Sequence, residues 1–317
     1  MRSDPVSLCE VTDGGCEVPE VLKDQQAATL MDGKELAKLV KDDLKVKIER
    51  HTSKGKRNPG LAVILAGDDS ASAIYVKNKV KSCEAAGIDS FFHKFPADVT
   101  EKELIDCVEK LNKDDKVDGI LVQLPLPGKL SADNVLDHLD PAKDADGLHP
   151  YNLGLLFCGK KGPTPCTPKG VMKLLEHYKI DPSGKNAVVI GRSNLVGKPA
   201  AALLTQKNAT VTVCHSKTAN LDEVCKQADI LVVAMGKREF VKGSWVKPGA
   251  TVIDVGIHHL QGEDGGKGKI AGDVCFAEAK DVAAYITPVP GGVGPMTVAM
   301  LLANTFENYE RKTGAVD

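Results

Sequence analysis

The sequence predicts an α/β protein whose two α/β domains flank a cleft. Short apolar segments alternate with stretches of helical periodicity, in one set before residue 141 and a second set after residue 168. The intervening stretch, Pro141–Pro168, is rich in Gly, Pro and Asp and lacks periodicity, which is typical of a linker that lines a cleft. A length of 317 residues also suits two domains.

The first set of elements is marked by helix-capping residues and apolar strands. Asp32-Gly33-Lys34-Glu35 has the spacing of a capping box, and apolar positions from Leu36 to Leu44 then mark one face of a helix. A second capping box at Thr100-Glu101-Lys102-Glu103 opens a helix that runs to about Leu111. The other elements expected here are strands at 61–65, 91–95 and 119–122 and a helix at 71–86. This alternation predicts a mostly parallel sheet.

The second set repeats the alternation and ends in a loop that is poor in side chains. Strands are expected near 186–190, 210–214, 229–234 and 250–255, with helices between them. The loop Pro288–Pro295 reads Pro-Val-Pro-Gly-Gly-Val-Gly-Pro, which predicts a rigid segment that presents mainly its backbone. A last helix is expected from about Met296 to Tyr309.

Composition argues against several classes of function. A net charge of −2 and an aromatic content of 4% favour neither nucleic acid nor an anionic membrane surface as partner. No apolar run approaches the roughly 20 residues that cross a bilayer. The 9 cysteines are scattered without a C-x-x-C pair, which fits reduced thiols in the cytoplasm better than disulfides or a metal site. Residues 1–28 lack the pattern of a transit or secretory peptide, and we expect a flexible tail there.

The most informative run is Ala187–Pro199, where an apolar β-branched segment enters a glycine turn and helix-compatible residues follow. Such a strand–turn–helix unit binds the phosphates of a dinucleotide through backbone N–H groups. The spacing Gly191-x-Ser193-x-x-x-Gly197 differs from the usual G-x-G-x-x-G. Arg192 favours NADP over NAD, because a cation pairs with an additional phosphate. An ordinary βαβ turn with a surface arginine is the alternative.

The next strand ends without the carboxylate typical of an NAD site. About 20 residues beyond the glycine turn, such a site places Asp or Glu on the ribose hydroxyls. This chain has His215-Ser216-Lys217 there. A carboxylate would repel a 2′-phosphate, whereas Ser216 can donate a hydrogen bond to it and Arg192 can pair with it as a fork. These residues strengthen the prediction of NADP.

A second group of polar residues lies in the first half of the chain. Tyr75 and Lys79 are four residues apart on one face of the predicted helix. Gln123 follows the strand at 119–122, at the strand end where α/β sheets place ligands, and Asp146 lies in the cleft-lining stretch. Each residue alone has a common structural explanation, such as a solvated lysine or a turn residue. Together with a nucleotide site they favour a catalytic group.

The chain resembles one enzyme family in five motifs, in order, over about residues 30 to 312. The family is the bifunctional methylenetetrahydrofolate dehydrogenase/methenyltetrahydrofolate cyclohydrolase. The motifs are Tyr75-Val-Lys-Asn-Lys79, Val122-Gln-Leu-Pro-Leu-Pro127, Lys143-Asp-Ala-Asp-Gly147, Gly191-Arg-Ser-Asn-Leu-Val-Gly-Lys-Pro199 and Pro288-Val-Pro-Gly-Gly-Val-Gly-Pro-Met-Thr297. The resemblance implies an N-terminal, amino-acid-dehydrogenase-like folate domain and a C-terminal Rossmann-type NADP domain.

The resemblance also implies roles for individual residues. Lys79 matches the catalytic lysine, Gln123 the glutamine that holds it, Tyr75 the tyrosine that stacks near folate, and Asp146 the carboxylate that binds the pterin. Leu124 and the segment Pro290-Gly291-Gly292-Val293 match substrate contacts. The cofactor contacts implied are Gly191, Arg192, Ser193, Ser216, Thr167 and Ile257. No metal is implied.

The activity implied is oxidation of 5,10-methylenetetrahydrofolate with NADP, followed by hydrolysis of the methenyl cation to 10-formyltetrahydrofolate. The implied assembly is a homodimer through the nucleotide domain. The expected domains are a folate-binding catalytic domain of residues 29–165 plus 297–317 and an NADP domain of residues 166–296. Three alternatives stay open: another NADP-dependent oxidoreductase with an amino-acid-dehydrogenase-like substrate domain, an NADP-binding module without catalysis, and a dehydrogenase with a weakened hydrolase.

Overall fold

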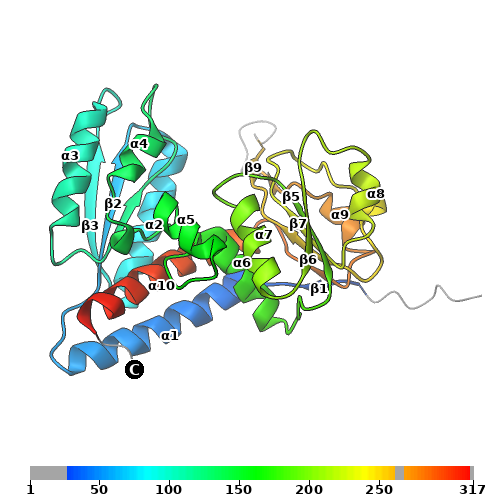
Figure 1. Ribbon diagram of the computed structural model, residues 1–317, viewed down its shortest axis with the longest axis horizontal. Coiled ribbons are helices and arrows are strands. Elements are labelled where there is room, and N and C mark those ends of the chain that lie inside the picture. The colour runs from blue at the N-terminus through cyan, green and yellow to red at the C-terminus, as the bar shows by residue number, and fades with distance from the viewer. Residues whose placement is uncertain (1–26, 261–267, 315–317) are drawn as a thin grey trace, which may run out of the picture.

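The computed structural model describes residues 27–260 and 268–314, and two parallel sheets organise them (Figure 1). Within these residues, one sheet has three strands in the order β3-β2-β4 and the other has six in the order β1-β11-β8-β7-β5-β6. All pairings in both sheets are parallel. This arrangement confirms the predicted α/β class with two domains.

The first domain has its sheet between connecting helices. Its strands are β2 (Gly60–Ala66), β3 (Asp89–Phe95) and β4 (Gly119–Val122). Its helices are α1 (Gly33–Ser53), α2 (Ser70–Ala86), α3 (Glu101–Asn112), α4 (Ala132–Asp137), the 3-10 turn Pro141–Lys143 and α5 (Pro150–Phe157).

The second domain contains the larger sheet. Its strands are β5 (Asn186–Ile190), β6 (Thr210–Cys214), β7 (Ile230–Val233), β8 (Thr251–Asp254), β11 (Tyr285–Ile286) and β1 (Thr29–Leu30). A separate antiparallel pair is β9 (His258–His259) with β10 (Ile270–Ala271). The helices of this domain are α6 (Cys166–His177), α7 (Gly197–Gln206), α8 (Leu221–Cys225), the 3-10 turn Gly243–Trp245 and α9 (Phe276–Ala279). The last helix, α10 (Val293–Thr313), packs on elements of both domains.

Most predicted elements are present, and their caps explain where they begin. The Thr100 side chain accepts from the Glu103 N–H and the Glu103 side chain accepts from the Thr100 N–H, as the predicted capping box requires. At the first helix the Asp32 side chain accepts from the N–H groups of Lys34 and Glu35. The cap at Asp32 is therefore formed, but within the described part of the chain Glu35 does not return the bond that completes a box.

The expectation of an unpatterned linker at 141–168 is wrong in part. Helix α5 lies within it, and α6 begins before it ends. Pro150 stands at the first turn of α5, and the His149 ring nitrogen accepts from the Tyr151 N–H at 3.0 Å. Histidine is not among the usual capping residues, so the sequence signal was weak. The expected tail lies outside the described residues apart from Ala27 and Ala28.

The inner strands of each sheet are buried on both faces, and one cluster of apolar side chains is shared by the two domains. In β2, Leu61, Val63 and Leu65 face a cluster shared with the central helices. The alternate residues Ala62 and Ile64 face a second cluster that α3 covers. The shared cluster continues into the six-stranded sheet, so packing fixes the two sheets relative to each other.

Helices α1 and α10 run side by side below the three-stranded sheet and extend toward the domain with the six-stranded sheet (Figure 1). Each is 21 residues long, and α10 also packs on α6. The start of α1 lies against the glycine-rich loop: a Cβ on Gly33 would lie 1.8 Å from the Gly292 carbonyl oxygen, and the Lys34 N–H donates to the Gly291 carbonyl at 2.9 Å. No helix in the described part of the chain has the length and apolar content needed to span a membrane.

Candidate active site

A cleft between the domains is formed by two adjoining cavities that share lining residues from both sides. Tyr75 comes from α2 of the first domain, whereas Val255 and Ile257 follow β8 of the second. Val293 and Gly294 at the start of α10 also line both cavities. The predicted cleft therefore exists, and strand ends and helix starts form its walls.

Lys79 and Gln123 meet in this cleft. The Lys79 ammonium donates to Gln123 Oε1 at 2.9 Å. The Gln123 side-chain N–H donates to the Leu124 carbonyl at 2.7 Å, which turns the amide oxygen toward the lysine. The Gln123 backbone N–H bonds the Ile64 carbonyl of β2 at 2.9 Å, which fixes the end of β4. The lysine thus has a neutral, oriented acceptor.

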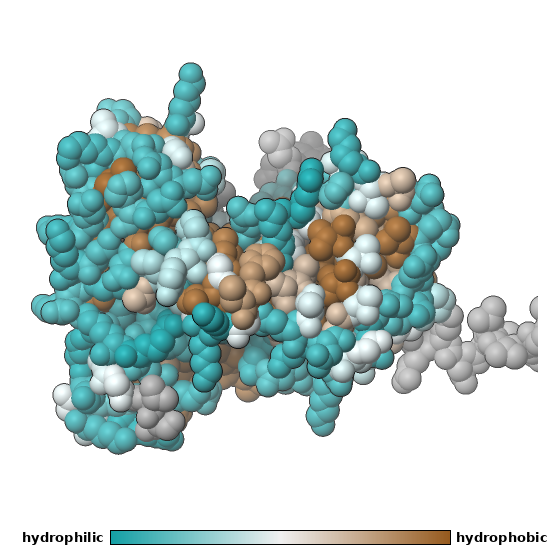
Figure 2. Space-filling model, viewed as in Figure 1, coloured by the Kyte–Doolittle hydropathy of each residue, from teal (hydrophilic) through white to brown (hydrophobic). Residues whose placement is uncertain are grey.

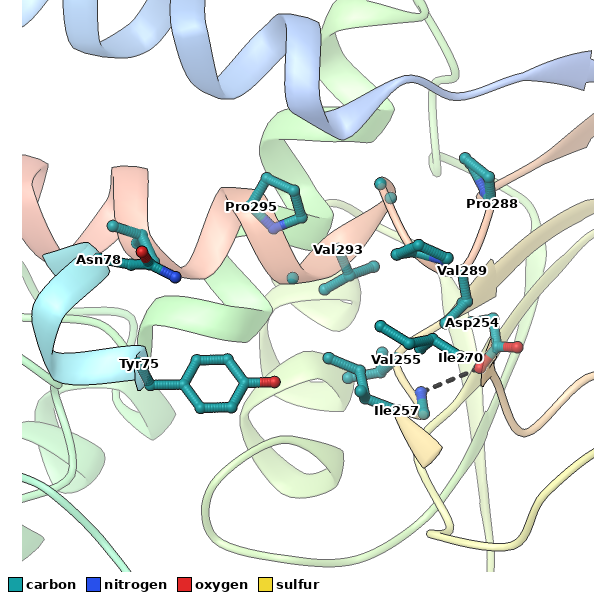
Figure 3. Close-up of a pocket in the computed structure, with 16 residues that line it drawn as sticks. Tyr75, Asn78, Asp254, Val255, Ile257, Ile270, Pro288, Val289, Val293 and Pro295 are labelled. Atoms are coloured by element: carbon teal, nitrogen blue, oxygen red, sulfur yellow. Dashed lines mark hydrogen bonds between the residues drawn. The ribbon is translucent and has the colours of Figure 1, made fainter. Parts of the chain in front are cut away.

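Tyr75 lies one helical turn before Lys79 and extends its ring into the cavity. Figure 3 shows the ring pointing from α2 toward Val255 and Ile257, with Val293 on the neighbouring wall. The side chain is 41% exposed, which is high for a tyrosine with an apolar ring. An exposed ring opposite apolar side chains leaves a slot in which a flat ligand can stack.

Asp146 lies where two parts of the stretch after β4 run together. Its backbone carbonyl accepts from the Cys166 N–H at 3.3 Å, and Ala145 N–H bonds the Ile120 carbonyl of β4. Burial raises the pKa of the Asp146 carboxyl; the positive charge of Lys79 opposes this shift and the negative charge of Asp144 adds to it. The Asp146 carboxyl is therefore close enough to interact electrostatically with Lys79, which lines the cleft.

Helix α10 fixes the segment next to Asp146 through hydrogen bonds. The buried Asn304 amide donates to the Ala145 carbonyl at 2.9 Å and to the Thr164 carbonyl at 2.8 Å. Gly147 has φ +73°, and a Cβ there would lie 2.3 Å from the Thr164 backbone. The two backbone segments are therefore as close as glycine permits, which sets the position of Asp146.

The loop Pro288–Gly292 presents backbone to the cleft, as the sequence predicts. One of the two cavities, the one that Lys79 does not line, is lined by Pro290, Gly291, Gly292 and Val293. Gly291 has φ +111°, which residues with a side chain rarely adopt. A Cβ on Gly292 would lie 2.6 Å from the Pro288 carbonyl oxygen. The loop can therefore approach a ligand closely along its backbone.

The predicted glycine turn connects β5 to α7. A Cβ on Gly191 would lie 2.2 Å from the Ala234 carbonyl oxygen, and one on Gly197 would lie 2.1 Å from the Gly191 carbonyl oxygen. Ser193 Oγ accepts from the Val196 N–H at 3.1 Å and supports the turn before α7. This tight strand–turn–helix unit fits a dinucleotide, because both glycines permit close packing at a helix N-terminus.

The predicted phosphate-reading residues lie at neighbouring strand ends. Gly191 N–H bonds the Cys214 carbonyl at 2.9 Å, which sets the ends of β5 and β6 next to each other. Arg192 and Ser216 follow these two ends and are exposed. Arg192 makes no hydrogen bond or ion pair with any residue from 27–260 or 268–314. Its guanidinium is free to bind an anion.

The remaining predicted contacts divide between the cavities. Thr167, Leu124 and Ile257 line the one that contains Lys79. Thr167 Oγ1 and Thr297 Oγ1 are 2.9 Å apart, a hydrogen bond between α6 and α10. Asp146, Gly191, Arg192, Ser193 and Ser216 are not among the lining residues of these two cavities.

Sequence reasoning missed several lining residues, which are Asn78, Asp254, Val255, Ile270, Thr297 and Val298. The position of Asn78, three residues after Tyr75, was a usable signal because both lie on one helix face. Asp254 ends β8 at the ligand-binding edge of the sheet, and the same rule that found Gln123 could have found it. Ile270 joins the cavity only through tertiary packing.

The fold and cleft define a class of enzymes that bind a dinucleotide on one α/β domain and a second substrate on another. Two models of one family match the chain: "Tetrahydrofolate dehydrogenase/cyclohydrolase, catalytic domain" at residues 31–146 and "Tetrahydrofolate dehydrogenase/cyclohydrolase, NAD(P)-binding domain" at residues 165–313. The chain belongs to the tetrahydrofolate dehydrogenase/cyclohydrolase family.

Individual relatives agree with the family models. The chain is 55% identical to the bifunctional protein FolD of Acetivibrio thermocellus over 280 residues, which are 88% of this chain and 96% of that protein. The FolD crystal structure from Campylobacter jejuni has a TM-score of 0.86 and 49% identity and covers 90% of this chain and 100% of its own. The Trypanosoma brucei FolD structure, complexed with NADP cofactor and inhibitor, has a TM-score of 0.87 and 39% identity, with 91% and 99% covered.

These comparisons confirm the family resemblance and the enzyme class that the sequence predicts. The chain is a bifunctional enzyme of folate one-carbon chemistry with an NADP-binding domain.

Proposed function

We propose that the cleft oxidises 5,10-methylenetetrahydrofolate to 5,10-methenyltetrahydrofolate with NADP⁺ and hydrolyses the methenyl cation to 10-formyltetrahydrofolate. The observation that carries this proposal is the hydrogen bond from Lys79 to Gln123, in a cleft whose opposite wall belongs to a dinucleotide-binding fold. An amine with an oriented neutral partner suits proton transfer, and a nucleotide domain suits hydride transfer. Together they serve both reactions.

The hydride-transfer half depends on alignment more than on a base. NADP⁺, when bound, accepts the hydride at its nicotinamide ring. The residues of this chain would orient the two ligands: Tyr75 stacks against the folate, and the backbone at Gly291 and Gly292 lies close to both. Ile257 and Thr167 contact the cofactor from the other side. Holding the reacting atoms in near-attack geometry supplies much of such a rate enhancement.

The same turn would select the phosphorylated cofactor. The packing at Gly191 and Gly197 fits the pyrophosphate turn, and the unpaired Arg192 and exposed Ser216 fit a 2′-phosphate. The charged fork of Arg192 can make two parallel hydrogen bonds to phosphate oxygens. NADP is therefore preferred over NAD.

Hydrolysis needs proton transfers that Lys79 can perform. Water adds to the amidinium carbon and loses one proton, and a ring nitrogen of the substrate is then protonated. The new hydroxyl group releases its proton to solvent as the carbon–nitrogen bond breaks and the formyl C=O forms. In its neutral form the Lys79 amine accepts the first proton, and its ammonium form supplies the second. Gln123 orients the amine without the negative charge that would favour the ammonium form.

Asp146 would bind the pterin ring. A pterin presents an amino group and a ring N–H on one edge, and a carboxylate accepts both at once. Burial of the Asp146 carboxyl, which raises its pKa, strengthens its hydrogen bonds to such donors because water competes less. Leu124 and Val293 line the same cleft and supply apolar contact.

The direct test follows NADPH and methenyltetrahydrofolate by absorbance with 5,10-methylenetetrahydrofolate as substrate. We expect NADPH to form and the methenyl signal to remain low, since hydrolysis removes it. Absence of NADPH would indicate a binding module. Persistent methenyl product would indicate a dehydrogenase alone.

We also propose that the protein is a homodimer through its nucleotide domain. Strand β6 is an edge of the six-stranded sheet, and Val213 on it is 41% exposed. Leu195 in the neighbouring turn is 50% exposed. Figure 2 shows apolar atoms gathered over this part of the right-hand domain, on a surface that is otherwise mostly polar. Sedimentation of Val213→Glu tests this, with a monomer expected and an unchanged mass as the contrary result.

Two further proposals concern domains and location. Helix α10 contacts α1, α2, β2 and β4, which supports residues 29–165 plus 297–317 as the folate domain and 166–296 as the NADP domain. The pairing of Thr29–Leu30 with β11 places the start of that range in the other sheet.

The described cysteines are all free thiols, which supports a reducing compartment such as the cytoplasm.

A further inference from the structure

Two buried aspartates join three backbone segments at the ligand-binding edge of the six-stranded sheet. Asp254 ends β8, and its carboxylate accepts the N–H groups of Gly256, Asp273 and Val274, each at 2.9 Å. Asp273 follows β10, and its Oδ2 accepts the N–H groups of Met235 at 2.8 Å and Gly236 at 2.9 Å. We call this pair of carboxylates the clamp, because it holds the segments after β7, β8 and β10 together.

Glycines make room for both carboxylates. A Cβ on Gly256 would lie 2.4 Å from the Asp273 carboxyl carbon. A Cβ on Gly272 would lie 1.9 Å from Asp254 Oδ2. Each carboxylate therefore occupies the space that a side chain of the facing segment would need, and the segments cannot shift independently.

The clamp has one further partner that is not backbone. His258 on β9 places Nε2 at 2.8 Å from Asp273 Oδ1, whereas Met235 and Gly236 bond the other oxygen of that carboxylate. The His258 side chain is 23% exposed, while that of Asp273 is fully buried. With this contact every oxygen of the Asp273 carboxylate has a donor.

The Asp254 carboxylate of the clamp carries a cost in folding free energy. Burial raises the pKa of Asp254 from its ordinary 3.8 to about 6, even with three N–H donors on the carboxylate. A raised carboxyl pKa means that ionisation costs folding free energy, and this cost appears as the pH rises from about 4 to about 6. The buried Asp254 carboxylate is thus kept at some cost beside the buried Asp273, and such arrangements occur at functional sites.

The clamp lies directly behind the cofactor side of the cleft. Val255, Gly256 and Ile257 follow Asp254 and line the cavity opposite Tyr75, and Figure 3 shows Asp254 with its hydrogen bond at the back of this wall. The segment after β7 also abuts the glycine turn, because the Ala234 carbonyl is the atom that a Cβ on Gly191 would strike. The clamp therefore fixes two segments, one that lines the cleft and one that packs against the glycine turn, where a dinucleotide would bind.

We propose that Asp273 and His258 are positioning residues for hydride transfer, which hold the Val255–Ile257 wall and the Met235–Gly236 turn in register with the folate side of the cleft. This inference rests on the proposed function. Hydride transfer needs both ligands aligned, whereas hydrolysis of the methenyl cation needs only the folate side. Loosening the clamp should therefore slow oxidation and spare hydrolysis.

The test compares His258→Leu, His258→Gln and the matched control His259→Leu. Leucine removes the donor to Asp273, whereas glutamine offers an amide N–H of similar reach. His259 is the neighbouring exposed residue of β9, and its side chain makes no hydrogen bond or ion pair within residues 27–260 and 268–314. Each variant is assayed for oxidation of methylenetetrahydrofolate with NADP⁺ and, separately, for hydrolysis of methenyltetrahydrofolate without cofactor.

We expect His258→Leu to lower kcat/KM for oxidation about tenfold, the scale of one lost hydrogen bond to a carboxylate. Hydrolysis should stay at the wild-type rate, His258→Gln should recover most of the oxidation, and His259→Leu should match wild type in both. Unchanged oxidation in His258→Leu overturns the proposal. So does an equal loss of both activities with a lower unfolding midpoint, which would mark a purely structural role. A wild-type protein lacking either activity would instead refute the proposed function.

Discussion

The two walls of the cleft differ in what they present to a ligand. The wall that we propose to bind folate, called the folate wall, is made of Tyr75, Lys79 and Gln123 and presents polar side chains on a helix and at a strand end. Asp146 lies outside the lining of the cavities and interacts electrostatically with Lys79. The wall that we propose to bind the cofactor, called the cofactor wall, is made of Val255–Ile257 and Gly291–Gly294 and presents glycines, short apolar side chains and backbone groups. The glycine turn from Gly191 to Gly197 belongs to the same domain but lines neither cavity. We propose that the first wall supplies a side chain that transfers protons, whereas the second supplies a surface that positions the ligands.

This difference matches the demands of the two reactions. Hydrolysis moves protons and therefore depends on a particular side chain, whereas hydride transfer depends on how closely two flat ligands approach. Substitutions in the folate wall should chiefly change hydrolysis, and substitutions in the cofactor wall should chiefly change oxidation. Four substitutions examine this separation, in decreasing order of expected effect.

Lys79→Met should slow hydrolysis of methenyltetrahydrofolate by about 10³-fold, the usual scale for removing a general acid–base group. Oxidation should keep a larger share of its rate. The measurement is the initial rate of methenyl loss without cofactor. Lys77→Met on the same helix, where the side chain is exposed, is the control and should behave as wild type. A full hydrolysis rate in Lys79→Met would exclude its role in proton transfer.

Arg192→Ala should weaken use of NADP⁺ and barely change use of NAD⁺. A charge-assisted contact to a phosphate is worth about 1.5–3 kcal/mol, which is roughly 10- to 150-fold in kcat/KM. Steady-state oxidation with each cofactor measures the difference. Arg238→Ala serves as control, because that arginine pairs with the adjacent Glu239. Equal losses with both cofactors would contradict phosphate recognition by Arg192.

Gly197→Ala should impair oxidation by distorting the turn at the start of α7. Its Cβ would lie 2.1 Å from the Gly191 carbonyl oxygen, so the backbone must move. Forced overpacking costs about 2 kcal/mol, which should appear as a higher KM for NADP⁺ and a lower unfolding midpoint. Gly154→Ala is the matched control, since no atom lies within 4 Å of that Cβ position. An unchanged KM would show that the turn does not touch the cofactor.

Gln123→Glu should slow hydrolysis at neutral pH by about tenfold, because a carboxylate beside Lys79 favours the ammonium form. The shape of the side chain is retained, so binding of folate should change little. The rate should recover as the pH is raised and more of the amine loses its proton. A rate at neutral pH equal to wild type would mean that the charge beside Lys79 does not limit hydrolysis.

Local signals predicted the parts of this molecule that depend on local structure. The bounds of β4, β5 and β6 agree with the expected ones, because apolar β-branched runs between turn residues are strong strand signals. The glycine turn was predicted because it directly follows one of these strand signals. Helix α5 was missed, since its cap is a histidine in a segment rich in proline and glycine.

Local sequence signals could not predict contacts between segments that are distant in the sequence. The clamp joins Asp254 and Asp273, which are 19 positions apart, and neither aspartate stands out in the sequence alone. The support of the Asp146 segment by Asn304, which lies on the last helix, exists only after α10 has packed. The family motifs pointed to Lys79 and Gln123 together, and the structure places their side chains 2.9 Å apart.

The separation of the two walls is tested most directly by assaying both half-reactions in Lys79→Met and Gly197→Ala side by side. We expect a crossed result: Lys79→Met loses mainly hydrolysis and accumulates the methenyl compound along with NADPH, while Gly197→Ala loses mainly oxidation and hydrolyses added methenyltetrahydrofolate at close to the wild-type rate. If both variants lose both reactions in the same proportion, the two walls do not divide the chemistry.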